Sequence, residues 1–392
     1  MKIVYSLPHP ADSLSSEQAG HTVRASAILG VLEKRGHEII RVEAARGSGA
    51  QTAVKTYRSL VKKLLPRFIA NQMRDRARVA YSLNYAGRLQ QVVEQARPDV
   101  ILETHIAFSL AGKTVSEKTG IPLGLDDVAP SWEEAQQYGG GAGGLAQRTH
   151  HEVTQQASLV VAVSQEIRRL LKEDGVAESK LVTISNGIDH KFFQTGTGGA
   201  EVRARYGIPA DTVVIVFVGS FQPYHRVDLL LEAFAQVKTD TPARLLLVGE
   251  GQRTPEAKAA ADRLGINARV TFTGRIPYDQ VAQYVAAGDV ATMPATNSYG
   301  NPMKIYEYMA QSKAIIAPDQ PTITEIVAHG ESAYLFQPEN VGALAAGLKR
   351  LIEDGGLRTK IAQRARADAD QHTWEKRGEA MEQALEKIRR KS

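Results

Sequence analysis

The stretch SYGNPMKIYEYMA, residues 298–310, combines residue types that could bind a diphosphate and a ribose. Pro302 suits an early helical position, so the Gly-Asn-Pro turn would lead into a helix N-terminus with exposed backbone amides. These amides would belong to Gly300, Asn301, Met303 and Lys304. With the Lys304 ammonium they could bind a diphosphate, while Glu307 could accept hydrogen bonds from a ribose. Lys304 and Glu307 would equally suit a solvated i, i+3 ion pair on an ordinary helix, so both interpretations stay open.

A second stretch with phosphate-binding features is VVIVFVGSFQPYHRVDLLLEAF, residues 213–234, in which an apolar run ends at Gly219 before a helix. The loop between them carries Ser220, His225 and Arg226. A glycine, a helix N-terminus and nearby cations are typical of a phosphate site, although an ordinary strand-helix turn also looks like this. The next such run, LLLVGEGQRT, ends at Gly249 and starts like a dinucleotide fingerprint. Because Thr254 stands in place of the third glycine, an NAD site is poorly supported.

Three polar residues follow apolar runs in the first half of the chain. His105 ends DVILETH, and Asp126 and Asp127 end IPLGLDD. At strand ends a histidine could contact a substrate, and the carboxylates could orient an acceptor hydroxyl. A strand-end histidine is also a common structural residue, and an Asp pair ahead of a helix is often a cap. No spacing of histidines and carboxylates is typical of a metal site, so we predict no metal.

The elements that must position these residues are short, β-branched apolar runs that alternate with longer amphipathic stretches. This alternation predicts parallel strands buried on both faces, in a doubly wound α/β arrangement. The pattern restarts after about residue 190, and QTGTGGAE (194–201) suits a linker. We therefore expect two Rossmann-like domains facing a cleft, at 1–194 and 195–372, with ligand at the carboxyl ends of the strands. The segment 373–392 should form a helix that packs back on the first domain.

Composition narrows the class of protein. The chain has 392 residues, with 48 Lys and Arg against 43 Asp and Glu and no cysteine. A net charge of +5 suits anionic small ligands or an acidic membrane surface but is too dilute to indicate nucleic acid. The N-terminal apolar run is too short for a signal peptide, and no stretch reaches about 18 uninterrupted apolar residues. We therefore expect a cytoplasmic protein.

Several motifs in a fixed order make the chain resemble a known family. AGHTVRASAILGVLEKRGHEI (19–39) resembles the loop and helix that open an acceptor domain. KLVTISNGIDHKFF (180–193) resembles the Asn-Gly-hydrophobic-Asp element before an interdomain linker. FVGSFQPYHRVDLLLEAF, LLLVGEG and SYGNPMKIYEYMAQSKAIIAPD then follow in the family's order. The chain is thus similar, over nearly its whole length, to the family 4 retaining glycosyltransferases of the GT-B fold.

The resemblance implies transfer of a sugar from a nucleoside diphosphate sugar to an acceptor hydroxyl, with retention and without metal or cofactor. The acceptor would belong to cell-surface glycan or glycolipid synthesis. It also implies that His105 faces the donor sugar, that Glu307 holds the ribose and that Arg275 lies near the base. Backbone amides at Gly20 and from Met303 to Lys304, together with the side chain of His225 or Arg226, would stabilise the departing diphosphate.

Some residues depart from the family's pattern. The family usually has an Arg after the glycine of the phosphate loop and a Lys five residues later, where this chain has Ser220 and His225; Arg226 is the candidate replacement. The first carboxylate of the family's Glu-x7-Glu motif falls on Tyr299, and only the second matches Glu307. These departures leave two alternatives open, a non-catalytic sugar-nucleotide-binding protein and a nonhydrolysing sugar-nucleotide epimerase of similar fold.

The segment KTYRSLVKKLLPRFIANQMRDRAR, residues 55–78, has eight basic residues and one acidic residue. Its apolar residues recur at helical spacing: Tyr57, Leu60, Val61, Leu64, Leu65 and Phe68. This pattern is typical of an interfacial helix, although the apolar face would also suit packing on the first domain. We predict peripheral association with the anionic inner face of the membrane and a lipid-linked or membrane-proximal acceptor. An anionic soluble glycan is the alternative ligand of this basic surface.

Overall fold

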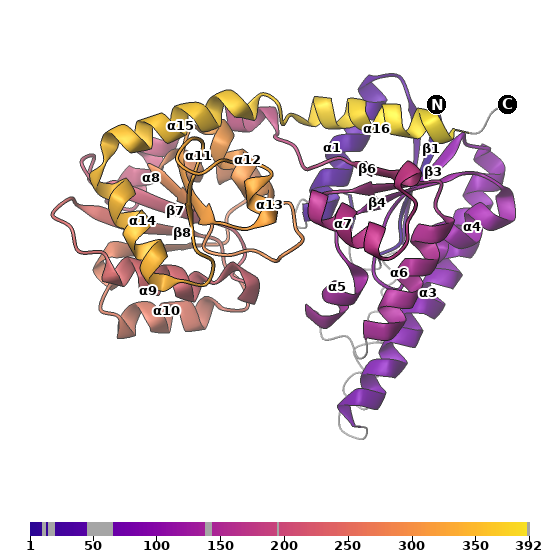
Figure 1. Ribbon diagram of the computed structural model, residues 1–392, viewed down its shortest axis with the longest axis horizontal. Coiled ribbons are helices and arrows are strands. Elements are labelled where there is room, and N and C mark those ends of the chain that lie inside the picture. The colour runs from indigo at the N-terminus through magenta and orange to yellow at the C-terminus, as the bar shows by residue number, and fades with distance from the viewer. Residues whose placement is uncertain (10–12, 15–19, 45–65, 138–142, 194–195, 390–392) are drawn as a thin grey trace. The chain divides into compact units, whose positions relative to one another are not determined.

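The computed structural model describes residues 1–9, 13–14, 20–44, 66–137, 143–193 and 196–389. The chain forms two compact units, of which the first is Met1–Ser185 with Arg377–Ser392 and the second is Asn186–Lys376 (Figure 1). Each unit is built on a six-stranded parallel sheet with helices on both faces. The predicted pair of doubly wound, Rossmann-like α/β domains is confirmed.

The sheet of the first unit has the order β2-β1-β3-β4-β5-β6, and every neighbouring pair is parallel. Its strands are β1 (Lys2–Leu7), β2 (Glu38–Glu43), β3 (Val100–Thr104), β4 (Leu123–Asp127), β5 (Leu159–Ala162) and β6 (Leu181–Thr183). Its helices are α1 (Gly20–Lys34), α3 (Arg67–Ala96), α4 (Ala111–Thr119), α5 (Ser131–Gln137), α6 (Gly143–Gln156) and α7 (Gln165–Glu173). In this sheet β2 lies on one side of β1, and the next strand along the chain, β3, lies on its other side. The strand order therefore reverses between β1 and β3.

The second unit repeats this design with the order β12-β11-β10-β7-β8-β9. Its strands are β7 (Val213–Val218), β8 (Ala243–Val248), β9 (Val270–Gly274), β10 (Val290–Thr292), β11 (Ala314–Pro318) and β12 (Tyr334–Phe336). All six residues of β7 are buried, because alternate side chains enter two separate cores. Val214 and Val216 belong to one core, whereas Ile215 and Phe217 belong to the core on the opposite face.

The helices of the second unit cover both faces of that sheet (Figure 1). They are α8 (Gly199–Arg205), α9 (Val227–Gln236), α10 (Thr254–Arg263), α11 (Val281–Ala286), α12 (Met303–Ala310), α13 (Pro321–Thr324), α14 (Val341–Glu353) and α15 (Gly355–Ala369). Short 3-10 turns connect them at η2 (His190–Phe193), η3 (Pro223–His225), η4 (Asn267–Arg269) and η5 (Tyr278–Gln280), and η1 (Glu178–Lys180) lies in the first unit.

The division between the units lies at Ser185 and Asn186, ahead of the position at 194 that the sequence suggested. The residues after Ser185 belong to the second unit because they form backbone hydrogen bonds with it. Ile188 forms a parallel bridge with Thr373, and its amide donates to the carbonyl of His372 at 2.7 Å. Of the expected linker 194–201, residues 194 and 195 lie outside the described residues, and α8 begins at Gly199.

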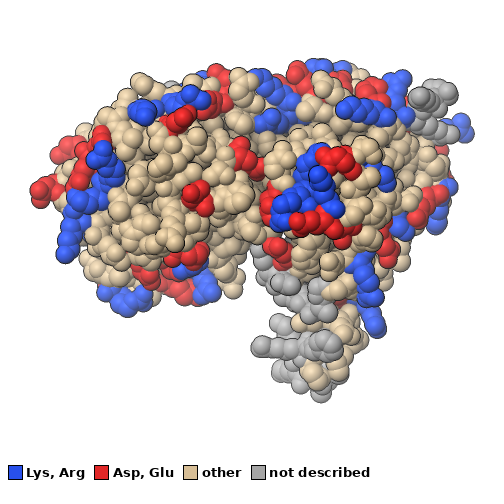
Figure 2. Space-filling model, viewed as in Figure 1, with Lys and Arg blue, Asp and Glu red and all other residues tan. Residues whose placement is uncertain are grey.

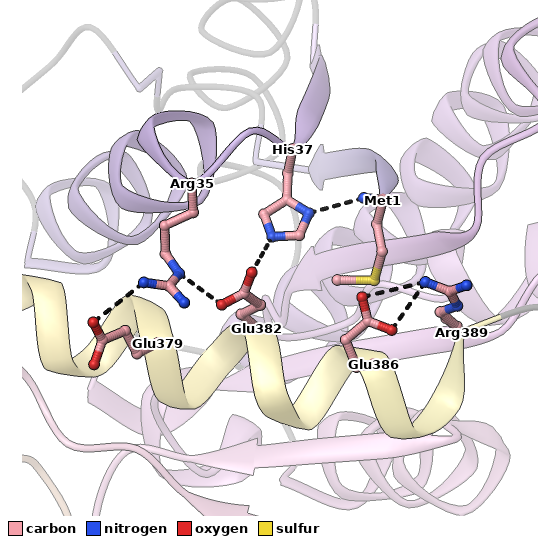
Figure 3. A network of polar contacts seen from close by, with 7 residues as sticks. All are labelled: Met1, Arg35, His37, Glu379, Glu382, Glu386 and Arg389. Atoms are coloured by element: carbon pink, nitrogen blue, oxygen red, sulfur yellow. Dashed lines mark hydrogen bonds and ion pairs between the residues drawn. The ribbon is translucent and has the colours of Figure 1, made fainter.

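The last helix, α16 (Trp374–Ile388), begins in the second unit and continues in the first. In the first unit Glu382 accepts hydrogen bonds from Arg35 Nε and from His37 Nε2, both at 2.6 Å (Figure 3). Gly378 lies against α1, where a Cβ atom would come within 2.3 Å of Val31. These contacts hold the second part of α16 on the turn between α1 and β2.

Charged side chains of both signs gather over α7 on the face shown in Figure 2. Arg169 bridges Glu166 and Glu173 there, and Arg168 pairs with Glu178. Since each cation has an acidic neighbour, this surface patch is a solvated mixed-charge face.

Candidate functional site

The candidate site lies where the strand order of the second unit reverses, at the carboxyl ends of β7 and β10. These two strands are neighbours, but the chain continues from β7 to β8 and from β10 to β11, on opposite sides. In open α/β sheets, ligands bind outside the carboxyl ends of the strands at such a point. Tyr308 of α12 fastens the helix there, because its Oη accepts from Val218 N at 3.1 Å and contacts Thr292 O at 3.4 Å.

Glycines allow the loops at these strand ends to pack backbone against backbone. Gly219 has a φ angle of 151° and Gly249 one of 121°. A Cβ atom on Gly249 would lie 2.2 Å from the carbonyl oxygen of Gly219, which no side chain could accommodate. Gly249 is therefore required for the close approach of the loops after β7 and β8, and Gly219 suits the backbone conformation of the first loop.

The ammonium of Lys304 lies directly beside the loop that follows β7. Its Nζ atom is 2.8 Å from His225 Nε2 and 5.6 Å from the centre of the Phe217 ring. A Cβ atom on Gly219 would be 3.3 Å from the same Nζ. The structure thus brings Lys304, His225 and Gly219 together, from two stretches that lie far apart in the sequence.

Burial sets the charge states of this pair. Burial lowers the pKa of Lys304 to about 8. The nearby Glu307 carboxylate has the opposite, smaller effect and raises this pKa. Burial and the Lys304 charge lower the pKa of His225 well below its ordinary value. Lys304 is therefore mainly an ammonium at neutral pH, and His225 is neutral. The positive charge at this point therefore comes from Lys304, as the sequence indicated, and the neutral His225 adds none.

Arg226 turns toward acidic side chains. It adopts a left-handed backbone conformation with φ 46° at the start of α9, and its guanidinium pairs with Asp228 at 3.0 Å and with Glu339. Ser220 is exposed, and its carbonyl oxygen accepts a hydrogen bond from His225 Nδ1. In this structure the Arg226 charge is thus paired with two carboxylates, and the side chain of Ser220 is uncharged.

The loop ahead of α12 is rigidly held, which changes the expected set of amide donors. Gly300 N donates to Asn297 Oδ1 at 2.8 Å, so this amide is already used inside the loop. The buried Asn301 accepts two hydrogen bonds from Asn186, from N to Oδ1 at 2.9 Å and from Nδ2 to the carbonyl at 2.6 Å. The amides of Met303 and Lys304 open the helix, where intrahelical acceptors do not exist.

Glu307 lies one turn further along α12, at 7% exposure. Its Oε1 accepts a hydrogen bond from the Tyr278 hydroxyl at 3.3 Å, which fixes the carboxyl group. Tyr299, at the position of the family's first carboxylate, is 3% exposed and belongs to the buried residues. Arg275 follows β9, keeps 65% of its side chain exposed and lies 3.5 Å from Glu250 in the loop after β8.

In the first unit, His105 lies immediately after β3, next to the corresponding reversal of strand order. Its Nε2 is 2.7 Å from Ser131 Oγ, and its ring is centred 4.8 Å from that of His150. His150 Nε2 in turn contacts Asp127 Oδ2 at 2.9 Å. Burial lowers the pKa of His105 to about 3, so its ring is neutral.

Asp126 likewise forms a buried ion pair, with Arg24. Arg24 of α1 donates from both Nε and Nη2 to this carboxylate at 2.9 Å. The same guanidinium donates to the carbonyls of Ile184 and Ser185, at 2.8 and 3.1 Å. Asp126 and Asp127 thus serve internal pairs in this structure. Arg24 could not be found from the sequence, because it lies 102 positions away from Asp126.

The remaining predicted features are Gly20 and a metal-free site. Gly20 begins α1 and is exposed, and no atom of the described residues lies within 4 Å of the position of a Cβ atom. Among the residues that the structure describes, no three or more His, Asp or Glu side chains are grouped so that they could hold a metal ion.

Two family models match successive parts of the chain. Glycosyltransferase Family 4 matches residues 19–192, and Glycosyl transferases group 1 matches residues 200–368. The chain belongs to the family 4 glycosyltransferases. The two matches fall on the two sheets, so the family's paired domains correspond to the two units of this chain.

This family 4 member is similar to two kinds of curated protein. The D-inositol 3-phosphate glycosyltransferase of Streptomyces avermitilis is 28% identical over 55% of this chain and 49% of its own length. The N-acetyl-alpha-D-glucosaminyl L-malate synthase of Bacillus anthracis is 27% identical over 73% of this chain and 74% of its own length. The chain spans about half the length of the Streptomyces relatives that it matches.

Solved structures show the same fold. Anabaena HepE, solved in complex with UDP-glucose, gives a TM-score of 0.75 at 21% identity and covers 99% of this chain and 100% of its own. Sucrose-phosphate synthase from Thermosynechococcus elongatus gives a TM-score of 0.80 at 16% identity, with 99% of each chain covered. The fold of this family 4 member is therefore GT-B.

Proposed function

We propose that this protein is a retaining, metal-independent glycosyltransferase that moves a sugar from a nucleoside diphosphate sugar to an acceptor hydroxyl. The observation that carries the proposal is helix α12. It brings the Lys304 ammonium, the amides of Met303 and Lys304 and the buried Glu307 carboxylate to the carboxyl ends of β7 and β10. A ligand with a diphosphate next to a ribose would use all of these groups. The family membership and the UDP-glucose bound to HepE support a donor of this class.

These groups would act mainly on the leaving diphosphate. As the bond from the sugar carbon to the phosphate oxygen breaks, negative charge grows on the diphosphate. Donors already aimed at that charge, the Lys304 ammonium and the helix amides, stabilise it without reorganisation. Glu307, fixed by Tyr278, would accept hydrogen bonds from the ribose hydroxyls. We place the base near the exposed Arg275.

The acceptor proton needs a destination. His105 is a poor general base because burial lowers its pKa to about 3, so we assign it a hydrogen bond to the substrate and no proton transfer. In our proposal the acceptor oxygen attacks from the face that the diphosphate leaves. The leaving phosphate oxygen then takes the proton, and the sugar keeps its configuration.

Calorimetric titration with UDP, GDP and ADP and with their glucose conjugates tests this function. Wild type should bind at least one of them, and Lys304→Met should bind the same ligand at least about tenfold more weakly, which corresponds to about 1.4 kcal/mol. Lys349→Met is the matched control, since Lys349 is an exposed lysine on α14 that pairs with Glu353. Equal affinity in wild type and Lys304→Met contradicts the proposal. Product analysis with acceptors then separates transfer from binding alone and from epimer formation.

We further propose that the acceptor is lipid-linked and that the protein adsorbs reversibly to anionic membranes through the segment 55–78. Residues 55–65 lie outside the described residues, but the rest forms the start of α3, which projects from the first unit (Figure 1). Ile69 and Met73 are each 42% exposed on successive turns, beside the exposed Arg76. Within the described part of the chain, no helix has the length and hydrophobicity to cross a bilayer. Adsorption is thus the form of attachment that the proposal requires.

Part of the basic charge of this segment is used internally. Arg74 lies 3.5 Å from Asp75, and Arg78 lies over the Phe108 ring at 5.4 Å. The apolar side chains are therefore the sharper test. In co-sedimentation with phosphatidylserine vesicles at low salt, wild type should bind, and Ile69→Asn with Met73→Asn should bind less. Leu83→Gln, which changes an exposed leucine further along the same helix, is the control. Wild type that stays in the supernatant contradicts membrane adsorption.

A further inference from the structure

The ring of His225 links the Lys304 ammonium to the backbone of the loop after β7. Its Nε2 lies 2.8 Å from Lys304 Nζ, and its Nδ1 contacts the carbonyl oxygen of Ser220. The ring is 6% exposed and packs against the Phe217 ring, with centroids 5.7 Å apart. Because both ring nitrogens are engaged and the ring is packed, its orientation is fixed.

The two partners determine which nitrogen carries the proton. An ammonium has only donors, so Nε2 must be the acceptor of that hydrogen bond. A carbonyl oxygen has only acceptor capacity, so Nδ1 must carry the hydrogen. The arrangement therefore requires the neutral Nδ1–H tautomer. A protonated His225 would place a second positive charge at hydrogen-bonding distance from Lys304, with no lone pair left to receive it.

We propose that His225 is a positioning residue, which holds the Lys304 ammonium at the ends of β7 and β10 as a neutral acceptor and does not itself bind the donor phosphates as a cation. This inference rests on the proposed function, in which Lys304 contacts the diphosphate. A lysine side chain has four rotatable bonds, and ordering it costs rotamer entropy. His225 and Phe217 order the ammonium before the ligand binds. Part of this entropy is therefore lost when the protein folds, and less is lost when the ligand binds.

A spectroscopic measurement tests the charge and tautomer without any ligand. In the ¹⁵N spectrum of ring-labelled protein, assigned by comparison with His225→Gln, the Nε2 of His225 should have the chemical shift of an unprotonated nitrogen. Its shift should stay constant between pH 6 and 7.5. A His225 ring that titrates in this range, or that carries its proton on Nε2, overturns the inference whether or not the protein is a transferase.

Three substitutions at position 225 separate a positioning role from direct phosphate binding. His225→Gln keeps an acceptor for the ammonium, His225→Leu removes it, and His225→Lys adds a cation. With the nucleoside diphosphate that wild type binds, positioning predicts a loss of at least about tenfold for Leu, partial rescue by Gln and a loss for Lys, because two ammonium groups would repel each other. Direct phosphate binding predicts the opposite order, with Lys at least as tight as wild type and Gln as weak as Leu. Unfolding temperatures identify any variant that fails to fold, and His225→Gln then still decides the question.

If wild type binds none of UDP, GDP and ADP, the proposed function fails, and the tautomer measurement alone judges the role of His225. If wild type binds and all three variants bind equally well, the positioning role fails while the proposed function stands. The two failures are therefore distinguishable.

Discussion

Raising the pH through 8 should weaken nucleoside diphosphate binding, because it removes the proton from Lys304. Burial lowers the pKa of this lysine from 10.5 to about 8, and the groups that face it are Glu307 on the same helix and the neutral His225 from the loop after β7. The shift means that the protein disfavours the ammonium by about 3 kcal/mol when no anion is bound. A diphosphate supplies the missing negative charge, so binding and protonation support each other.

The size of the effect follows from a single titration. If only the ammonium form binds tightly, the dissociation constant is nearly constant below pH 7 and rises tenfold per unit well above the pKa. With a pKa of about 8, the constant at pH 9.5 should be about 30-fold that at pH 7. Calorimetry across this range measures it directly.

Lys304→Arg is the matched control, because a guanidinium stays charged throughout the range. Dividing the wild-type affinity by that of the variant at each pH removes the ionisation of the nucleotide itself. The ratio should fall above pH 8. A ratio that is flat from pH 7 to 9.5 would refute the argument that the Lys304 ammonium holds the diphosphate.

Four further outcomes are expected. Glu307→Gln should raise the Michaelis constant for the donor or lower turnover, so that kcat/KM in steady-state kinetics falls by a factor that corresponds to about 2–3 kcal/mol. Near-normal kinetics would contradict the ribose assignment. EDTA should leave transfer unchanged, and a strict requirement for Mg²⁺ or Mn²⁺ would argue against the mechanism. Burial raises the pKa of Glu103 from 4.5 to about 7, so the folded state holds this proton more tightly than the unfolded chain. About 3 kcal/mol of stability is therefore lost as the pH rises from 4.5 to 7, and in urea titrations Glu103→Gln should exceed wild type in stability at pH 8 but not at pH 5. Arg24→Met should lower the free energy of unfolding by about 3–5 kcal/mol because it leaves the Asp126 charge buried, and adding Asp126→Leu should recover part of that loss.

The fold could be predicted because its signals are local. An apolar run such as β7, bounded by a glycine and followed by an amphipathic stretch, indicates a buried parallel strand from a dozen residues. The placement of Lys304 and Glu307 on one helix behind a turn was predictable for the same reason. The role of the Gly300 amide was harder to predict, since its hydrogen bond to the Asn297 side chain depends on the conformation of the loop.

The polar partners could not be predicted, because they join residues that are distant in sequence. His225 and Lys304 are 79 positions apart, and Arg24 and Asp126 are 102 apart. The sequence predicted a phosphate-binding cation at His225 because nothing local shows that a partly buried ammonium faces its ring. Charge states of this kind depend on burial and on neighbours that only the folded chain brings together.

A crystal structure with the bound nucleoside diphosphate would show directly which groups hold the ligand. We expect the diphosphate at the start of α12, within hydrogen-bonding distance of Lys304 Nζ and of the amides of Met303 and Lys304, with the ribose hydroxyls on Glu307. A nucleotide bound away from the carboxyl ends of β7 and β10, or a diphosphate held by Arg226 with the Lys304 ammonium turned away, would contradict it.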